Sequence, residues 1–321
     1  MRILHLIYSL NVGGAERMVI TLANYQVQSN QVGLCIINNL YSQKLLNELD
    51  SRIQVFRINR KKASRNILDV FQLNRYVFKF RPDILHIHDS DAILYIPIRS
   101  FYHTILTIHA MNLPLKGYKL YNQTVAISKA VADNTENRGL CRPEVIYNGI
   151  STSAIQRTKK NIPNAEQNFR IVQVGRLEHG IKGQHLILKA LHRLSSSHIS
   201  IDFIGDGSSY NYLKEVTRQL KLEKQVNFLG NCDIEWIYHH LCDYHLLVQP
   251  SISEGFGLTI AEGMAAEVPV LVSDLPAPLE IIDKGKQGYY FRHNDVDDLC
   301  RMLRYIIKHY EEALQLSDKA Q

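Results

Sequence analysis

The sequence predicts an α/β protein that consists of two doubly wound domains, each built on a parallel sheet. The chain has 321 residues, whereas a single hydrophobic core rarely grows beyond about 250–300 residues. Short apolar runs alternate with segments of helical periodicity in both halves of the chain, which is typical of parallel strands connected by helices. Between the halves, residues 151–168 are polar and have no period. This break predicts a linker.

The first domain is expected to span residues 1–150. Its apolar runs, such as ILHLIY and ILHIH, are nearly uninterrupted, as in parallel strands that are buried on both faces. The expected strands are Met1–Tyr8, Gly33–Asn38, Gln54–Ile58, Ile84–His88, Thr104–Ile108, Gln123–Ile127 and Val145–Tyr147. The expected helices are Ala15–Gln28, Tyr41–Leu49, Ile67–Phe80 and Lys129–Asn137.

The second domain is expected to span residues 165–295 and to repeat the same alternation. Its expected strands are Phe169–Val174, Ser200–Ile204, Val226–Leu229, His245–Gln249 and Val270–Ser273. Its expected helices are Gln184–Leu194, Ser209–Leu220, Glu235–Leu241 and Leu258–Ala266, followed by a last helix over residues 296–316. Two such domains that face each other would bind a ligand in the cleft between the carboxyl ends of their strands.

The composition indicates a globular protein without a membrane span. Hydrophobic residues make up 45% of the chain and charged residues 21%, which argues against disorder. No apolar stretch reaches the roughly 20 residues that cross a bilayer, and the N-terminal run lacks the apolar region of a signal peptide. The five cysteines are odd in number and widely spaced, as in a reducing compartment. We therefore expect a cytoplasmic protein.

A glycine-rich turn with two glutamates follows the apolar strand LLVQPS. In the segment SEGFGLTIAEG, Gly255 and Gly257 allow a ligand to approach the backbone closely, and the amides at the start of the next helix attract anions. Glu262 lies about two turns into the expected helix, eight residues after Glu254, so the two carboxylates can contact different parts of one ligand. The alternative is a turn with one capping acid and one solvated acid.

Two cations lie in the loop VGRLEHGIKG, which follows another expected strand. Arg176 and Lys182 are six residues apart. A fork-shaped guanidinium and a compact ammonium are suited to neutralise a diphosphate. The alternative is that both are ordinary solvated surface cations.

The first half offers weaker candidates. Gly13 and Gly14 connect the first strand to the first helix in the segment NVGGAE, which is neither a G-x-G-x-x-G fingerprint nor a phosphate-binding P-loop. His109 ends the strand TILTIH, where its ring can hydrogen-bond a ligand hydroxyl or serve as a structural histidine.

The motifs together resemble a known family. NVGGAER, TIHA, VAISKAV, VIYNGI, VGRLEHGIKG, FIGDG, VNFLG and PSISEGFGLTIAEGMA occur in this order from Met1 to about Phe291, and this combination is similar to the family 4 retaining glycosyltransferases. The resemblance implies the GT-B fold and a hexosyltransferase that uses a nucleoside-diphosphate sugar without a metal or other cofactor. It also implies that the last helix packs back on the first domain.

The resemblance further assigns roles to individual residues. Arg176 and Lys182 would hold the donor diphosphate, which Gly13 and Gly14 would abut. Glu254 would face the donor sugar, and Glu262 would bind the ribose. The turn around sugar and phosphate would consist of Gly255, Phe256, Gly257 and Leu258. His109 would lie near the transferred sugar, so the catalytic residues implied are Glu254, His109, Arg176 and Lys182.

Two metal-like patterns are set aside. Asp89-Ser90-Asp91 is a D-x-D sequence, but a hard cation needs more oxygen ligands than this pair offers. His86 and His88 share one face of a strand, but no third ligand is apparent in the sequence. We therefore expect no metal site.

The segment from Arg57 to Arg81 is strongly basic. It contains Asp69 as its one acid and the cations Arg57, Arg60, Lys61, Lys62, Arg65, Arg75, Lys79 and Arg81. Apolar and aromatic residues recur at near-helical spacing among them, which fits either a helix on an anionic membrane surface or a core helix with a solvated face. No nucleic-acid motif accompanies the charge.

The expected acceptor is a glycan or lipid-linked oligosaccharide used in bacterial surface polysaccharide synthesis, at the inner face of the cytoplasmic membrane. Three other functions are considered. A sugar-nucleotide epimerase with the same fold would convert the donor without an acceptor, and a non-catalytic subunit would only bind the nucleotide sugar. A dinucleotide oxidoreductase lacks its fingerprint here.

Overall fold

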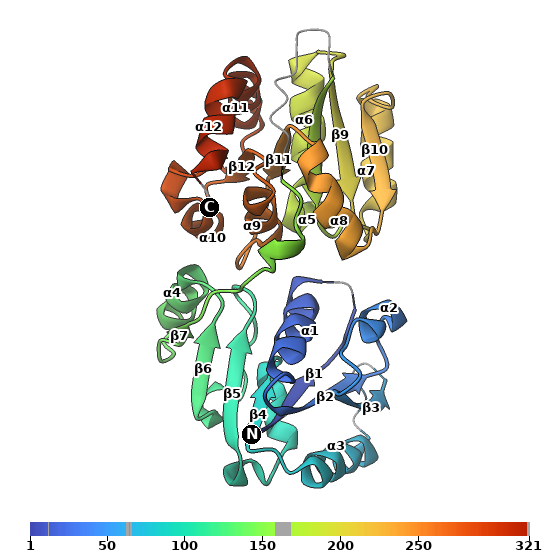
Figure 1. Ribbon diagram of the computed structural model, residues 1–321, viewed down its shortest axis with the longest axis vertical. Coiled ribbons are helices and arrows are strands. Elements are labelled where there is room, and N and C mark those ends of the chain that lie inside the picture. The colour runs from blue at the N-terminus through green and yellow to red at the C-terminus, as the bar shows by residue number, and fades with distance from the viewer. Residues whose placement is uncertain (12, 62–63, 65, 158–167, 320–321) are drawn as a thin grey trace. The chain divides into compact units, whose positions relative to one another are not determined.

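The computed structural model describes residues 1–11, 13–61, 64, 66–157 and 168–319. The chain divides into two compact units, Met1–Asn148 and Gly149–Gln321 (Figure 1). Of the predicted linker, residues 158–167 lie outside the described residues. Within the described part of the chain, no helix has the length and the hydropathy needed to cross a bilayer.

The first unit is built on a 7-stranded parallel sheet with the order β3-β2-β1-β4-β5-β6-β7. The strands are β1 (Arg2–Ile7), β2 (Gln31–Asn38), β3 (Gln54–Arg60), β4 (Ile84–Ile87), β5 (His103–Ile108), β6 (Gln123–Ala126) and β7 (Glu144–Val145). The helices are α1 (Gly14–Gln26), α2 (Gln43–Asn47), α3 (Ile67–Phe80) and α4 (Lys129–Asn137). The strand order reverses between β1 and β4, and ligands of such sheets bind at the carboxyl ends of the strands beside this reversal.

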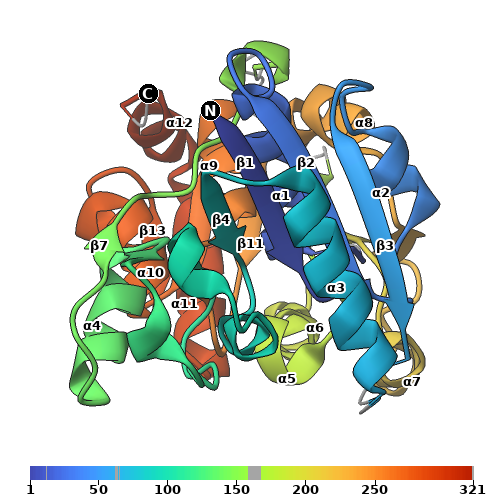
Figure 2. The same cartoon turned by 90° about the horizontal axis from the view of Figure 1, so that it is seen from below.

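Helices cover both faces of this sheet. Leu6 of β1 belongs to the same core as Val77 of α3, whereas the next residue, Ile7, belongs to the core that contains Val19 of α1. Figure 2 shows α3 lying across strands β1, β2 and β3. A fully buried aliphatic side chain contributes about 1.5–3 kcal/mol, so successive apolar residues stabilise opposite faces of the sheet. This explains the nearly uninterrupted apolar runs in the sequence.

The second unit repeats the plan with a 6-stranded parallel sheet of order β10-β9-β8-β11-β12-β13. The strands are β8 (Phe169–Val174), β9 (Ile199–Ile204), β10 (Val226–Gly230), β11 (Leu246–Gln249), β12 (Val270–Ser273) and β13 (Tyr289–Phe291). The helices are α5 (His179–Lys182), α6 (Gln184–Leu194), α7 (Tyr210–Gln219), α8 (Ile234–His240), α9 (Leu258–Ala265), α10 (Pro276–Ile281), α11 (Val296–Lys308) and α12 (Tyr310–Asp318). Here the strand order reverses between β8 and β11. The predicted fold class, two doubly wound parallel-sheet units, is confirmed.

The expectation of one continuous last helix is wrong. The structure has two helices, α11 and α12, which are separated at His309. Their apolar side chains, including Leu303 and Leu314, belong to the core of the second unit together with Leu191 of α6. The hydroxyl group of Tyr310 also donates a hydrogen bond to the carbonyl oxygen of His245, at 3.0 Å. The apolar stripe of these helices is therefore buried in the core of the second unit.

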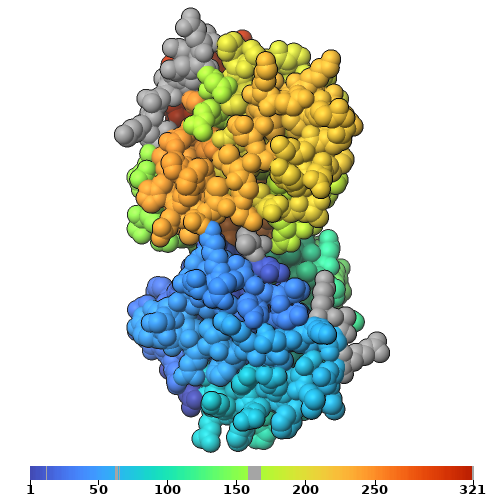
Figure 3. All heavy atoms as spheres, turned by 90° about the vertical axis from the view of Figure 1, so that its right-hand side faces the viewer, coloured from blue at the N-terminus to red at the C-terminus, as the bar shows by residue number. Residues whose placement is uncertain are grey.

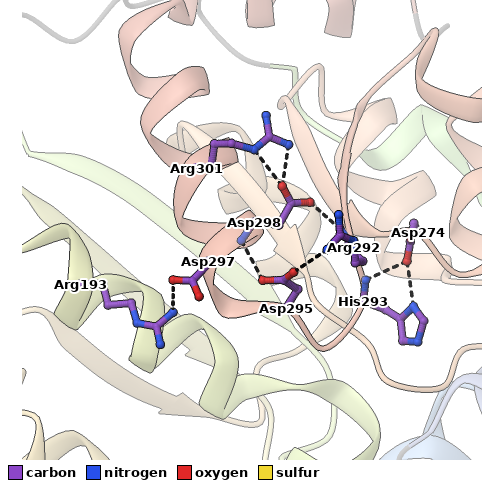
Figure 4. A network of polar contacts seen from close by, with 8 residues as sticks. All are labelled: Arg193, Asp274, Arg292, His293, Asp295, Asp297, Asp298 and Arg301. Atoms are coloured by element: carbon purple, nitrogen blue, oxygen red, sulfur yellow. Dashed lines mark hydrogen bonds and ion pairs between the residues drawn. The ribbon is translucent and has the colours of Figure 1, made fainter.

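Polar contacts hold the start of α11 (Figure 4). The carboxylate of Asp295 caps the helix by accepting a hydrogen bond from the amide of Asp298, at 3.0 Å. The carboxylate of Asp298 accepts from the amide of Arg292 and from the guanidinium group of Arg301. Such a cap stabilises a helix by about 1 kcal/mol, so it defines where α11 begins.

Candidate functional site

Three loops of the second unit lie against one another where β8, β9 and β11 end. A Cβ atom added to Gly183 would lie 1.9 Å from the carbonyl oxygen of Pro250, and one added to Gly205 would lie 2.2 Å from the carbonyl oxygen of Gly175. Backbone therefore contacts backbone, which only glycine permits at these two positions, because both also have positive φ angles of 69° and 132°. Gly183 therefore lets the loops after β8 and β11 approach closely, and Gly205 does the same for the loops after β8 and β9.

Lys182 and Glu254 form an ion pair between these loops. The ammonium group of Lys182 lies 2.7 Å from Oε2 of Glu254, and the side chains are only 23% and 11% exposed. The hydroxyl group of Ser251 donates a second hydrogen bond to the same carboxylate oxygen, at 3.2 Å. The carbonyl oxygen of Lys182 accepts a hydrogen bond from the side-chain amide of Gln173. Two residues 72 positions apart in the sequence are thus held in one place at the strand reversal.

Arg176 does not join this pair. Its guanidinium group lies 3.3 Å from the carboxylate of Glu178 and its side chain is 48% exposed. Its carbonyl oxygen accepts a hydrogen bond from the side chain of Gln184 at the start of α6. The backbone of Arg176 is therefore anchored beside the ion pair, while its charged end lies at the surface.

The second predicted motif forms the turn into α9. Gly257 has a φ angle of 110° and its carbonyl oxygen accepts a hydrogen bond from the amide of Ile260. Phe256 is buried in the turn, and Leu258 is the first residue of α9. Glu262 is also buried, in the second turn of α9. The two glutamates consequently lie in different environments: one is paired with Lys182, and the other lies within the helix layer.

The candidates of the first unit lie at the carboxyl ends of its central strands. Gly13 and Gly14 follow β1 and begin α1, whereas His109 directly follows β5. A pocket of about 260 Å³ lies beside the ends of β4 and β5, and its lining includes His88, Asp89 and Lys116. The predicted residues of this unit therefore lie on the sheet edge at which doubly wound folds bind their ligands.

A buried histidine network is the main feature that the sequence did not predict. His5 of β1 hydrogen-bonds both Gln26 of α1 and His88, through Nε2 at 2.8 Å and Nδ1 at 3.1 Å. His88 Nδ1 lies 2.9 Å from His109 Nε2. Burial lowers the pKa of His5 and of His109 to about 4 and that of His88 well below its usual range. All three rings are therefore neutral at pH 7.

The sequence argument against a metal site was that His86 and His88 have no third ligand, and the structure contradicts this argument. One nitrogen from each of His5, His86 and His88 lies within 4.8 Å of the others, so the third ligand that the sequence did not reveal is His5. Strand register provides it, because His5 of β1 pairs directly with His86 of β4. The signal was present in the runs ILHLIY and ILHIH, which become neighbours only when β1 and β4 pair.

The aspartates of the D-x-D sequence have a different role. Oδ2 of Asp89 accepts a hydrogen bond from the backbone amide of Tyr8, at 2.6 Å. Burial raises the pKa of this carboxyl group to about 6. Among the described residues, neither Asp89 nor Asp91 belongs to a group of side chains close enough to hold a metal ion. Asp89 therefore ties the end of β4 to the end of β1.

Two family models together match most of the chain. The model described as "Glycosyl transferases group 1" matches residues 154–321, and the model described as "Glycosyltransferase Family 4" matches residues 12–154. A Haemophilus influenzae protein named an uncharacterized glycosyltransferase is 23% identical over 97% of this chain and 91% of its own length. The lipopolysaccharide 1,6-galactosyltransferase of Salmonella typhimurium is 25% identical over 57% of this chain and 52% of that protein.

Solved structures show the same fold. The crystal structure of HepE from Anabaena in complex with UDP and glucose matches with a TM-score of 0.83 at 21% identity, over 100% of this chain and 94% of that one. A glycosyltransferase from Rickettsia africae matches with a TM-score of 0.80 at 22% identity, over 99% and 91% of the two chains. At these identities the likeness concerns the fold alone.

Proposed function

The chain belongs to group 1 of the glycosyl transferases, and from this premise we propose that it transfers a hexose from a nucleoside-diphosphate sugar to a hydroxyl acceptor with retention of the anomeric configuration. The family resemblance of the sequence is thereby confirmed. The observation that supports the proposal most directly is the ion pair of Lys182 and Glu254, which lies at the strand reversal of the second unit. This unit, residues 165–295 in the predicted boundaries, would bind the donor.

The chemistry proposed for this site begins with the leaving group. When the bond between sugar and diphosphate breaks, negative charge grows on the phosphate and positive charge on the sugar. Lys182, Arg176 and the amides from Gly255 to Leu258 would stabilise the phosphate, and such preorganised donors supply the largest catalytic effect in many enzymes. Because protein cations take this part, the proposed reaction needs no metal ion or other cofactor.

The two glutamates would contact different parts of the donor, the sugar and the ribose. Glu254 already accepts two hydrogen bonds, so it is fixed in position to contact the sugar, where its charge favours an oxocarbenium-like state. Glu262, in the second turn of α9, would bind the ribose of the nucleotide. In the first unit, predicted as residues 1–150, Gly13 and Gly14 would abut the diphosphate and His109 would contact the transferred sugar.

The acceptor is proposed to be a glycan or a lipid-linked oligosaccharide of bacterial surface polysaccharide synthesis. Of the similar proteins, one is named a lipopolysaccharide galactosyltransferase and another an O-antigen chain mannosyltransferase, both from Salmonella typhimurium. The solvent face of α3 supports a membrane-associated acceptor, because Ile67, Phe71 and Phe78 are 62–77% exposed. The protein would then work in the cytoplasm at the inner face of the membrane.

The experiment tests donor, acceptor and ion pair together. The purified protein is incubated with UDP-, GDP-, ADP- and TDP-sugars, with and without lipid-linked acceptors, and release of the nucleoside diphosphate is measured. We expect the Lys182→Met variant to lose about 100-fold or more in kcat/KM, as when one oxyanion donor is removed. Lys189→Met is the matched control, because Lys189 is an exposed cation on α6, and it should retain full activity.

Three results would contradict the proposal. Failure of all four nucleotide-sugar classes to bind would exclude the donor site. Conversion of the donor into an epimer without any acceptor would assign the protein to the epimerases. Glu254→Ala should lower turnover far more than nucleotide affinity, so an equal loss of both would exclude a contact of Glu254 with the sugar.

A further inference from the structure

Four side chains of the first unit form one continuous line of hydrogen bonds. Oε1 of Gln26 lies 2.8 Å from Nε2 of His5, and Nδ1 of His5 lies 3.1 Å from Nε2 of His88. Nδ1 of His88 lies 2.9 Å from Nε2 of His109. The line therefore runs from the last residue of α1, through β1 and the end of β4, to the residue that follows β5.

Each ring in this line has one proton to place. A neutral imidazole donates through one nitrogen and accepts through the other. His5 and His88 are hydrogen-bonded through both ring nitrogens, and His109 ends the line. The tautomer of one ring therefore determines the tautomer of the next. The three rings can point all their protons toward Gln26 or all away from it, and a mixed arrangement would set two donors or two lone pairs against each other.

Gln26 decides between the two directions. Its Oε1 atom only accepts, so His5 donates from Nε2 and presents a lone pair at Nδ1. His88 then donates from Nε2 to that lone pair, and His109 donates from Nε2 to the lone pair of His88. The line ends with a lone pair on Nδ1 of His109. This atom is buried and has no hydrogen-bond partner among the described residues.

We propose that Gln26 is a positioning residue that acts through His5 and His88 to keep Nδ1 of His109 unprotonated, as a hydrogen-bond acceptor for a hydroxyl group of the donor sugar. This inference rests on the proposed function of the protein. An unsatisfied buried acceptor costs about 1–3 kcal/mol, and a ligand hydroxyl would recover that cost. A sugar hydroxyl would thus donate its hydrogen bond to Nδ1 of a neutral His109 ring whose tautomer is fixed.

The test compares two variants at position 26 with one variant at a neighbouring position. Gln26→Leu removes the acceptor, whereas Gln26→Glu keeps an acceptor at a half-buried position. Gln28→Leu is the matched control, because Gln28 lies just beyond α1 and outside the line. Nitrogen-15 NMR of histidine-labelled protein, without any ligand, reports which nitrogen of His109 carries the proton, and the resonance is assigned by its loss in His109→Gln.

The expected results differ among these proteins. His109 should be the Nε2–H tautomer in the wild type, in Gln26→Glu and in Gln28→Leu, and a mixture of tautomers in Gln26→Leu. In Gln26→Leu, kcat/KM for the nucleotide sugar should fall about two- to tenfold, the range of one neutral hydrogen bond. The affinity for the nucleoside diphosphate alone should not change, since it lacks the sugar.

Each of the following outcomes would overturn the inference. The first is a His109 ring in wild type that carries its proton on Nδ1, or a tautomer that Gln26→Leu leaves unchanged. The second is about one equivalent of zinc or another metal in the purified protein that is lost in His5→Gln, because metal-bound nitrogens cannot form this line. The third is a changed tautomer with unchanged kcat/KM, which would remove the sugar contact of His109 while leaving donor binding by the second unit intact.

Discussion

At the scale of single residues, the glycines of the predicted motifs act mainly by letting loops pack. Gly183 lies between α5 and α6 with a φ angle of 69°. A Cβ atom there would overlap the carbonyl oxygen of Pro250, just after β11. The residue therefore controls how closely Lys182 approaches Glu254. The sequence motif identifies such a glycine, but only the structure shows the backbone atom against which it packs.

Replacement of Gly183 by alanine tests this reading. We expect Gly183→Ala to lower the free energy of unfolding of the second unit by at least about 2 kcal/mol, because the left-handed backbone conformation and the steric overlap act together. Gly180→Ala is the control, since a Cβ atom at Gly180 has no neighbour within 4 Å and the residue lies in α5. Urea unfolding measures both variants. Equal stability of the two would show that the loops do not need this close approach.

The residues of the candidate site were predictable to different degrees. Arg176, Lys182 and Glu254 stand in recognisable motifs, and the structure brings the last two into contact. The pairing itself does not follow from sequence, because it depends on the packing of two loops 72 residues apart. The line from Gln26 to His109 was missed for a similar reason. It depends on the register of β1 against β4, which places His5 beside His86.

At the scale of elements, strands and helices with a clear period were predicted well, and short ones were not. Strand β13 has three residues, Tyr289–Phe291, which is too short to show a period. Helix α10 begins at Pro276, and proline occurs at the first position of helices although it breaks their interior. The last helix was expected to be continuous over residues 296–316, but the structure has two helices that are separated at His309.

Helix α3 has a core-packing face and an exposed apolar face. Leu73, Val77 and Phe80 are buried, as expected for a core helix, whereas Ile67, Phe71 and Phe78 are exposed. At 100° per residue the exposed apolar side chains fall on one face, with Arg75 beside them. Figure 3 shows the side of the first unit to which β3 and α3 contribute, in blue to cyan. Lys62 and Arg65 of the basic segment lie outside the described residues.

This face gives a prediction for membrane binding. The double variant Phe71→Ser and Phe78→Ser should bind vesicles of anionic phospholipid about tenfold or more weakly than the wild type, because burial of each ring in the lipid interface contributes about 1.5–3 kcal/mol. Phe101→Ser is the control, since Phe101 is 81% exposed but lies outside α3. Cosedimentation measures binding. A wild type that does not bind anionic vesicles, or three proteins that bind equally, would contradict the proposal.

At the scale of the whole molecule, each unit has hydrophobic cores of its own, so we expect two unfolding transitions. The single tryptophan, Trp236, lies in α8 and packs against a core of the second unit. Its fluorescence therefore reports the second unit alone, whereas circular dichroism reports both. Comparison of the two signals therefore distinguishes unfolding of the first unit from unfolding of the second.

Acid should destabilise mainly the first unit. Burial lowers the pKa of His5 and His109 from 6.5 to about 4, so the unfolded chain binds protons that the folded unit does not. Their stabilising effect is complete above pH 6.5 and is lost as the pH falls toward 4. Asp89 acts in the opposite direction, because its raised pKa of about 6 lets the folded unit take up a proton first. His185, whose pKa is also lowered to about 4, gives the second unit a smaller response.

Between pH 7.5 and 5.5 we therefore expect the first unit to lose about 2 kcal/mol, because each of the two rings contributes about 1.4 kcal/mol over the pH unit below 6.5 and Asp89 offsets part of this loss. The transition seen by circular dichroism but not by Trp236 should shift most. UDP at 100 times its dissociation constant should shift the Trp236 transition instead, by about 2.7 kcal/mol, if the second unit binds the nucleotide. A nucleotide that stabilises only the transition without a tryptophan signal would place the donor site in the first unit and contradict the roles of Lys182 and Glu254.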